Sequence, residues 1–487
     1  MKVPANTSNA QFEHENKTCK IFAPIRLLPL ETLIEIFSYT VKPWSVPRID
    51  QAPMSVSQVC STWRQASFMC PVLWKTLKID GLADHPDNFQ SNILSWWFER
   101  ANRSSLSFSL SQGLVGSNHK LTERILDALF PFSHRLAHLH LSVTSLNELD
   151  PFLSDNSGTR LPLLKKLDLG VRHDPVEIRT IGVFRSASAL RDATLGIPSD
   201  ILAISSYFAF PWGQLTRLTI VSPLTSSAFS WIIIQCEQLV YASLFVDVAL
   251  SSGLEDPPSP LPVTLAHLST LILKVDDCSD DSTLEDTLDR LVLPSLKKIQ
   301  FSISDTESQF KFSKAIPSLE YTSLTCLVIV NGVSYPYELS HVLKLCNALE
   351  ELAIENVRVF ACELLETLLR CAYFLPSLTS FVFVFEDEDF DDELAEIFSE
   401  LVQEWARDPA RRQPLKAVTL YGCGVDDECA KEVFSDIRDM LVPWREADEE
   451  GSVAVSQSGM VLCTRAVTRP FDLAAALQNW FDVEGDI

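Results

Sequence analysis

A short apolar frame returns at a nearly fixed interval through most of this 487-residue chain. The frame reads apolar-x-x-apolar-x-apolar, and successive copies begin 24 to 29 residues apart, except for a last interval of 37. Weaker copies lie near Leu77 and Leu106, and clear copies begin at Leu136, Leu164, Leu190, Leu215, Leu239, Leu268, Leu296, Leu324, Leu349, Leu378 and Leu415. Chance does not hold such spacing over ten intervals, so we expect a chain built from repeated units.

The pattern within each unit predicts one strand followed by a connection that is often helical. The last three frame positions alternate as a strand does, and stretches such as ELSHVLKLCNAL and FSWIIIQCEQL between frames have a helical pattern. A single unit cannot bury its apolar face alone, so stacked units should share one parallel sheet with helices on its other side. An ordinary α/β domain stays open as an alternative, although no glycine-rich phosphate loop follows any frame.

The frame leucines that face the helices should form the core, and these include Leu167, Leu218, Leu271, Leu327 and Leu352. A strand and a helix every 24 to 29 residues resembles the leucine-rich repeat. The asparagine usual in that repeat is mostly absent here, so a regular asparagine ladder is not expected. The resemblance implies a horseshoe-shaped solenoid with its parallel sheet on the concave side.

A different pattern precedes the repeats, between Leu28 and Trp74. Pro29 suits the first turn of a helix because its missing N–H would be unpaired there anyway. One apolar stripe follows at Leu30, Leu33, Ile34 and Phe37, and a second helical pattern runs from about Met54 to Phe68. Between them lies VKPWSVPRIDQAP, whose three prolines exclude a regular helix.

This segment resembles the F-box, a helical motif of roughly forty to fifty residues. The trailing PVLW at residues 71–74 also resembles the segment that commonly follows the motif in fungal members. The proline-rich insert around residues 41–53 departs from the usual compact middle of the motif. The resemblance implies docking onto a Skp-type adaptor, and through it a cullin, by Leu28, Pro29, Leu33, Ile36, Phe37, Val59, Trp63 and Arg64.

Residues between the core positions of each frame should face the concave side of the sheet. In leucine-rich-repeat members of the F-box family that face, or the loops at its rim, often receives the target. The expected target-binding residues are His138, His140, Lys166, Asp168, Arg217, Tyr241, Lys298 and Glu351. Their mixed chemistry does not select a class of ligand.

Composition excludes several classes of function. The chain has 64 acidic and 40 basic residues, a net charge of −24, which disfavours nucleic acid and anionic membrane surfaces as partners. No apolar run is long enough for a membrane helix, and the polar first twenty residues lack a signal core. We therefore expect a cytoplasmic or nuclear protein, with scattered cysteines such as Cys60, Cys346 and Cys371 acting as small buried side chains.

The sequence offers no catalytic or cofactor site. His138 and His140 lie on one strand face, but no nearby cysteine or carboxylate in the sequence completes a zinc site. The spacing of Cys423 and Cys429 fits no standard metal site, and the acidic run at 386–393 has no turn glycine for calcium. No nucleophile elbow, P-loop or HExxH motif occurs. The Trp96-Trp97-Phe98 cluster should pack the helical segment against the first repeats.

The predicted fold class is α/β: a small all-helical F-box followed by an irregular leucine-rich-repeat solenoid. The expected parts are a disordered tail at 1–24, the F-box and its linker at 25–79, the solenoid at 80–444, and a linker and cap at 445–487. Within the last part we expect a strand at 461–463 and a closing helix at 470–481 with Leu473, Leu477, Trp480 and Phe481 on one face.

The expected function is that of a non-catalytic, substrate-recognition subunit of a Skp–cullin–F-box ubiquitin ligase, with an unknown target protein. One alternative is an interaction scaffold built on the repeats that never joins a ligase. A second is an enzyme on an α/β scaffold, which would show a deep polar pocket with clustered titratable groups.

Overall fold

The computed structural model describes residues 25, 28–80, 87–111, 119–145, 160–171, 181–198, 202, 208–247, 262–276, 288, 290–303, 323–331, 336–356, 361–371, 375–386, 392–407, 417–423, 444–447, 452–456 and 461–467. The predicted tail at 1–24 and closing helix at 470–481 lie outside these residues.

Three short helices and one 3-10 turn form the N-terminal unit: α1 (Leu30–Ser38), α2 (Met54–Gln58), α3 (Ser61–Phe68) and η2 (Pro71–Trp74). Pro29 caps α1, as its position predicts. The apolar stripe of α1 turns inward, so Leu33 and Phe37 are each only 1% exposed. The Phe37 ring lies 5.0 Å from the Trp63 ring, which packs α1 against α3.

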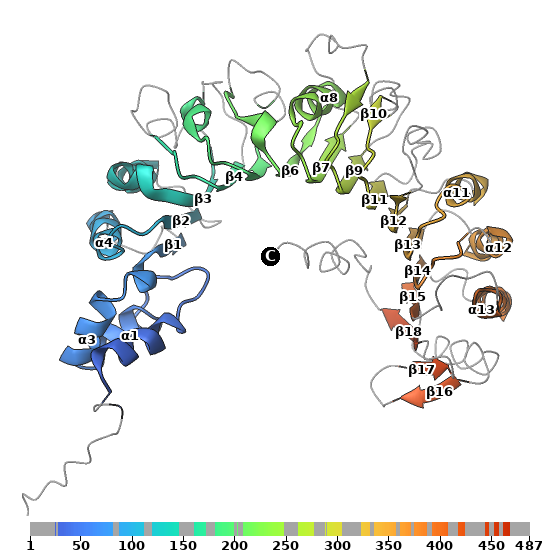
Figure 1. Cartoon of the computed structure of the whole chain (residues 1–487), viewed down its shortest axis with the longest axis horizontal. Coiled ribbons are helices and arrows are strands. Elements are labelled where there is room, and N and C mark those ends of the chain that lie inside the picture. The colour runs from blue at the N-terminus through green and yellow to red at the C-terminus, as the bar shows by residue number, and fades with distance from the viewer. Residues whose placement is uncertain are drawn as a thin grey trace, which may run out of the picture.

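One open sheet of sixteen strands spans the rest of the described chain (Figure 1). Its parallel part contains, in spatial order, β1 (Thr76–Asp80), β2 (Leu106–Ser111), β3 (Leu136–Val143), β4 (Lys166–Val171), β5 (Asp192–Gly196), β6 (Arg217–Leu224), β7 (Tyr241–Asp247), β9 (Thr270–Asp276), β11 (Lys298–Ile303), β12 (Cys326–Val330), β13 (Glu351–Asn356), β14 (Ser380–Glu386), β15 (Ala417–Cys423) and β18 (Val461–Val467). Every predicted frame is therefore confirmed as a strand, including the weaker copies at β1 and β2.

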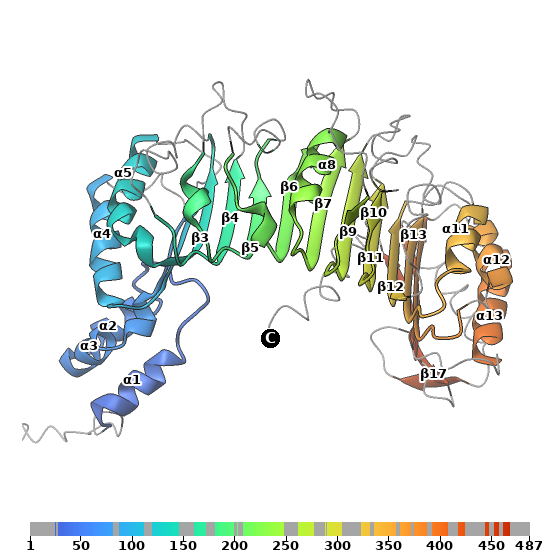
Figure 2. The ribbon, with the colours of Figure 1, turned by 45° about the horizontal axis from the view of Figure 1, so that its top comes forward.

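Figure 1 shows the sheet bent into an arch, with the strands on the inner side and the helices outside. The tilted view of Figure 2 shows the same order of strands along the arch. The outer elements are α4 (Asp87–Arg100), α5 (His119–Leu129), η4 (Phe130–Arg135), η7 (Val183–Ser186), η8 (Trp212–Gln214), α8 (Ser226–Gln235), α11 (Pro336–Leu343), α12 (Ala361–Cys371), α13 (Asp392–Arg407) and the parallel pair β8 (Val263–Thr264) and β10 (Leu291–Val292). Both helix-like stretches of the sequence, at α8 and α11, are confirmed.

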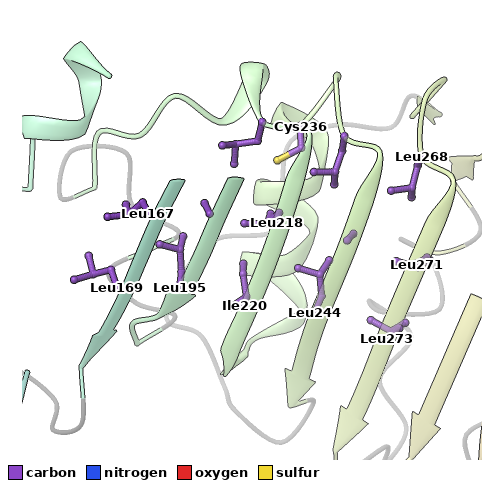
Figure 3. Close-up of a cluster of buried hydrophobic side chains, with 14 of the residues drawn as sticks. Leu167, Leu169, Leu195, Leu218, Ile220, Cys236, Leu244, Leu268, Leu271 and Leu273 are labelled. Atoms are coloured by element: carbon purple, nitrogen blue, oxygen red, sulfur yellow. The ribbon is translucent and has the colours of Figure 1, made fainter. Parts of the chain in front are cut away.

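The core is a set of apolar rows that run across the strands on the helix-bearing side. Register places Leu167 beside Leu139 and Ala193, and Leu218 beside Ala193 and Ala242. Figure 3 shows members of these rows on neighbouring strands, among them Leu167, Leu218 and Leu271. The predicted core leucines are 0 to 4% exposed, which confirms their assignment: Leu167, Leu218, Leu271, Leu327 and Leu352.

Hydroxyl groups link successive units where an asparagine ladder is missing. At the second position of the frame, a serine or threonine donates its hydroxyl to the carbonyl of the equivalent residue one unit earlier. The observed pairs, at 3.1 to 3.2 Å, are Thr216 to Arg191, Ser269 to Val240, Thr325 to Lys297 and Thr379 to Glu350. The same carbonyls also accept backbone N–H groups of the next unit, so each hydroxyl adds to a main-chain link between units.

The two edges of the sheet are closed in different ways. At the first edge, Lys78 of β1 donates its backbone N–H to the carbonyl of Ser45, which lies in the proline-rich insert (2.8 Å). At the other edge, β18 pairs antiparallel with β17 (Ser452–Ser456), which pairs with β16 (Trp444–Ala447). The predicted strand at 461–463 is present within β18, and two further strands occur where the sequence indicated a linker.

Aromatic rings join the helical unit to the array. Trp74 of η2 lies 5.1 Å from Trp96 and 5.0 Å from Trp97, both in α4. The guanidinium of Arg100 lies 3.7 Å from the Trp96 ring centre and 4.7 Å from that of Phe68. The role predicted for the Trp96-Trp97-Phe98 cluster is thus confirmed, and the helical unit is packed firmly on the first repeats.

Replacing Leu218 by alanine should lower the free energy of unfolding by about 2–5 kcal/mol, because it leaves a cavity between two strands and α8. Thr219→Ala is the matched control, since Thr219 is on the other face of the same strand and should cost under about 0.5 kcal/mol. Urea-induced unfolding followed by circular dichroism measures both. Equal costs for the two variants would contradict the assigned faces of β6.

Candidate interaction surfaces

Large exposed apolar side chains gather on the N-terminal helical unit. Thirteen such side chains occur in the described part of the chain, and eight of them lie within residues 25–72. They are Ile25, Ile36, Tyr39, Ile49, Val59, Phe68, Met69 and Val72. This unit is a small fraction of the chain, so the concentration is far above that of the array and is typical of a surface that another protein covers.

The residues predicted to bind an adaptor divide into interior and surface positions. Leu33 and Phe37 are interior side chains of the unit, and Leu28 and Trp63 are half-buried against the core. Pro29, Ile36, Val59 and Arg64 are exposed. Arg64 also donates from Nε to the Ser57 carbonyl (3.0 Å), so it holds α3 against α2. Ile36 and Val59 are therefore exposed enough to contact a partner directly. Leu33 and Phe37 are core residues that support this surface from inside the unit.

The residues predicted to bind a target share the inner face of the arch. Six of them fall in one row that crosses nine neighbouring strands in register: His138, Lys166, Asp192, Arg217, Tyr241, Thr270, Lys298, Cys326 and Glu351. His140 and Asp168 are register partners in the next row. The structure thus brings all eight predicted residues onto one continuous surface.

Some neighbours in the row contact one another. Lys166 Nζ lies 3.5 Å from Asp192 Oδ2, and the Arg217 guanidinium lies 3.7 Å from the Tyr241 ring centre. The ion pair offsets one positive charge, whereas the tyrosine ring leaves the charge of Arg217 in place. The face therefore presents polar groups of both signs.

The proline-rich insert reaches this inner face. The Trp44 ring lies 4.8 Å from the His138 ring, and His138 donates from Nε2 to Asp168 Oδ2 (2.8 Å). The hydroxyl of Thr76 donates to Ser45 Oγ (3.1 Å) beside this contact. The insert, which departs from the usual motif, is therefore a strap that ties the helical unit to the concave face.

Asp168 is the most strongly perturbed carboxyl at this contact. Its burial would raise its pKa, but the hydrogen bond from His138, with His140 Nδ1 at 3.6 Å and the charge of Lys166, holds the pKa well below its usual range. A carboxyl whose folded pKa is depressed stabilises the folded state above its unfolded pKa. That stabilisation is lost as the pH falls through the acid range.

The inner face becomes apolar toward the C-terminal strands. Cys326, Val328, Ala353, Val382 and Val384 form a cluster apart from the main core, and each is at most 5% exposed. Burial and the neighbouring Glu351 raise the pKa of the Cys326 thiol. This thiol is therefore a packing group rather than a nucleophile.

Several residues of this surface, among them Asp192 and Trp44, escaped the sequence reasoning. Asp192 occupies the same frame position as Lys166 and Arg217, so applying the frame to every repeat would have identified it. Trp44 lies in an irregular, proline-rich segment, and no periodic signal relates it to His138, almost a hundred residues later. Only tertiary structure brings these two rings together.

The described residues contain neither a clustered set of metal ligands nor a helix able to cross a membrane. Within those ranges, no group of three or more His, Cys, Asp or Glu side chains is arranged to hold a metal ion. None of the helices described there has the length and apolar character needed to cross a bilayer. Cys346 is buried as predicted, whereas Cys60 is only partly buried, and the Cys371 side chain lies outside the described ones. Cys236 is buried too, and burial raises the pKa of the Cys236 and Cys346 thiols to about 12.

Comparison with known proteins identifies one part of the chain. The F-box-like family profile matches residues 25–80, so an F-box-like domain lies at this position. No curated protein matches the chain. Among solved structures, the chain is similar to one in the "Crystal structure of TLR13-ssRNA13 complex", at 14% identity and a TM-score of 0.29, over 72% of this chain and 49% of that one. The chain therefore spans about half the length of that protein.

Replacing Asp168 by asparagine should destabilise the protein by about 1–3 kcal/mol at pH 7, because the amide loses the charge-assisted bond with His138. The difference between wild type and variant should shrink as the pH is lowered from about 5 toward 2, because below the ordinary carboxyl pKa the unfolded chain takes up a proton that the folded Asp168 carboxylate resists. Urea midpoints measured at several pH values test both points. A difference that stays constant over this range would show that the Asp168 charge contributes nothing to folding.

Proposed function

We propose that this protein is a non-catalytic, substrate-recognition subunit of a Skp–cullin–F-box ubiquitin ligase. In this proposal the F-box-like domain at 25–80 docks on a Skp-type adaptor, and a leucine-rich-repeat array of irregular type holds the target protein. The observation that carries the proposal is the F-box-like match on the very unit that concentrates exposed apolar side chains.

Support for adaptor docking comes from the chemistry of the helical unit. Ile36 is 40% exposed and Val59 is 59% exposed, although both belong to helices or their caps with buried neighbours. Apolar side chains in such positions lower the solubility of a free monomer, and burial by a partner removes that cost. The core beneath them, Leu33 and Phe37, keeps this surface in one shape.

Support for target binding comes from the inner face and from its fixed relation to the F-box-like domain. The row that begins at His138 gives a concave surface of polar groups at regular strand spacing. The Trp74, Trp96 and Arg100 contacts on one side and the Trp44 contact on the other fix the two surfaces relative to each other. A rigid connection would raise the effective concentration of a target near the transferring enzyme, which is a proximity effect and requires no catalytic group here.

The double variant Ile36→Glu/Val59→Glu should lose affinity for a Skp-type adaptor by roughly 30-fold or more, as expected when buried interface anchors are replaced by charges. Surface charges should leave the fold intact, which circular dichroism checks. Val240→Glu is the matched control, because Val240 is 41% exposed but belongs to the array. Titration of purified adaptor by calorimetry gives the affinities.

Two results of this experiment separate the candidates. Normal adaptor binding by the double variant would remove Ile36 and Val59 from the docking surface. No adaptor binding and no co-purified cullin with the wild-type chain would favour the alternative, a repeat scaffold outside any ligase. Phe37→Ala alone does not decide the case, because Phe37 is buried and its loss would unfold the unit.

A further inference from the structure

A cavity of about 300 Å³ lies on the helix-bearing side of the arch, away from both surfaces described above. The residues that matter for its chemistry are Arg185, Phe208, Phe210, Trp212, Trp231 and Gln235. They come from η7, the segment before η8, η8 itself and α8, the outer helix labelled near the top of Figure 1. Neither the F-box-like domain nor the concave row contributes to it.

Aromatic rings in fixed positions form the walls. Phe208 and Phe210 are stacked with centres 4.8 Å apart, Phe210 lies 4.8 Å from Trp212, and Trp212 meets Trp231 edge-on at 6.4 Å. Phe208 and Trp212 are almost completely buried, whereas Phe210 and Trp231 are half-buried and present part of each ring to solvent. A ligand that stacks here meets faces that are already ordered, so little conformational entropy is lost on binding.

The polar groups of the cavity are mainly donors. The Arg185 side chain is exposed and has no ion pair among the described residues, although the chain as a whole is strongly acidic. Trp212 Nε1 is buried without a hydrogen-bond partner in that same part of the chain. It is shielded from water, so an acceptor reaches it only if the ring shifts slightly. Gln235 donates from Nε2 to the Trp231 carbonyl (3.0 Å), which leaves its own carbonyl oxygen as the one side-chain acceptor.

We propose that this cavity binds a proline next to an acidic residue in an extended segment of a partner protein. A proline residue offers an apolar ring and a carbonyl acceptor but no N–H donor, which suits an aromatic site whose accessible donor is the Arg185 guanidinium. Proline-containing segments are preordered in the extended helical form that aromatic grooves recognise. The acidic neighbour pairs with Arg185, and the same guanidinium disfavours cationic ligands that an aromatic cage would otherwise attract.

The experiment uses the full chain and a fluorescein-labelled peptide, Ala-Asp-Pro-Pro-Ala-Pro-Asp-Ala, followed by fluorescence anisotropy. We expect saturable binding of this peptide, and at least about tenfold weaker binding by Arg185→Glu and by Trp231→Ala, as for the loss of an interface anchor. Arg370→Glu is the matched control, because Arg370 is an exposed arginine on α12 and should leave binding unchanged. A peptide with lysine in place of aspartate should bind Arg185→Glu better than wild type.

Several outcomes would overturn the proposal. Absence of saturable binding to the wild-type chain is one, and equal binding by Arg185→Glu is another. A third is equally tight binding of a peptide with alanine in place of every proline, which would show that the cavity recognises the charge of the peptide and not its prolines. If Trp231→Ala perturbs the fold, Arg185→Glu decides the case, because it changes an exposed side chain. None of these outcomes depends on adaptor or cullin binding, so the proposed ligase role stands or fails separately.

Discussion

In-register stacking of apolar side chains on the helix-bearing side of the sheet holds the whole array together. The strands of this sheet from β3 to β9 each contribute one to three buried leucines or isoleucines, and parallel register places them beside those of the next strand. A one-residue slip would turn these side chains to the inner face, so the same row that stabilises the array also fixes its register. The polar row on the inner face is regular because the apolar row behind it is regular.

The proposed function depends on this fixed geometry more than on any single group. The proposed adaptor-binding surface and the proposed target-binding surface are joined by aromatic packing at Trp74 and Trp96 and by the strap at Trp44. The two joints lie on different sides of the first strands, so they resist rotation as well as separation. A flexible linker with the same two surfaces would give a lower effective concentration and no preferred direction of approach.

Periodic features were predictable from the sequence, and irregular ones were not. The frame leucines, the strands and the α8 and α11 helices follow from a repeat whose period is visible in the letters. The F-box-like segment was recognised from its own residues, but those residues differ in burial. Leu33 and Phe37 lie in the interior, and periodicity alone does not distinguish an apolar stripe that packs inside the chain from one that a partner covers.

The Trp44 contact with His138 and the aromatic cavity near Trp231 are long-range contacts of irregular segments, which no local pattern encodes. The hydroxyl links at Thr216, Ser269, Thr325 and Thr379 were invisible for a different reason, because serine and threonine are too common to signal a ladder.

The Ser45 contact with β1 has a practical consequence for work on this protein. An unpaired strand edge is a template for association with other chains, and here the insert of the helical unit supplies the partner for the N–H of Lys78. Cutting away the N-terminal unit to isolate the array would uncover that edge together with the Trp96 and Trp97 rings. Loss of activity in such a truncated protein would then report aggregation as readily as loss of a binding site, so point substitutions on the surface are the sounder way to divide its functions.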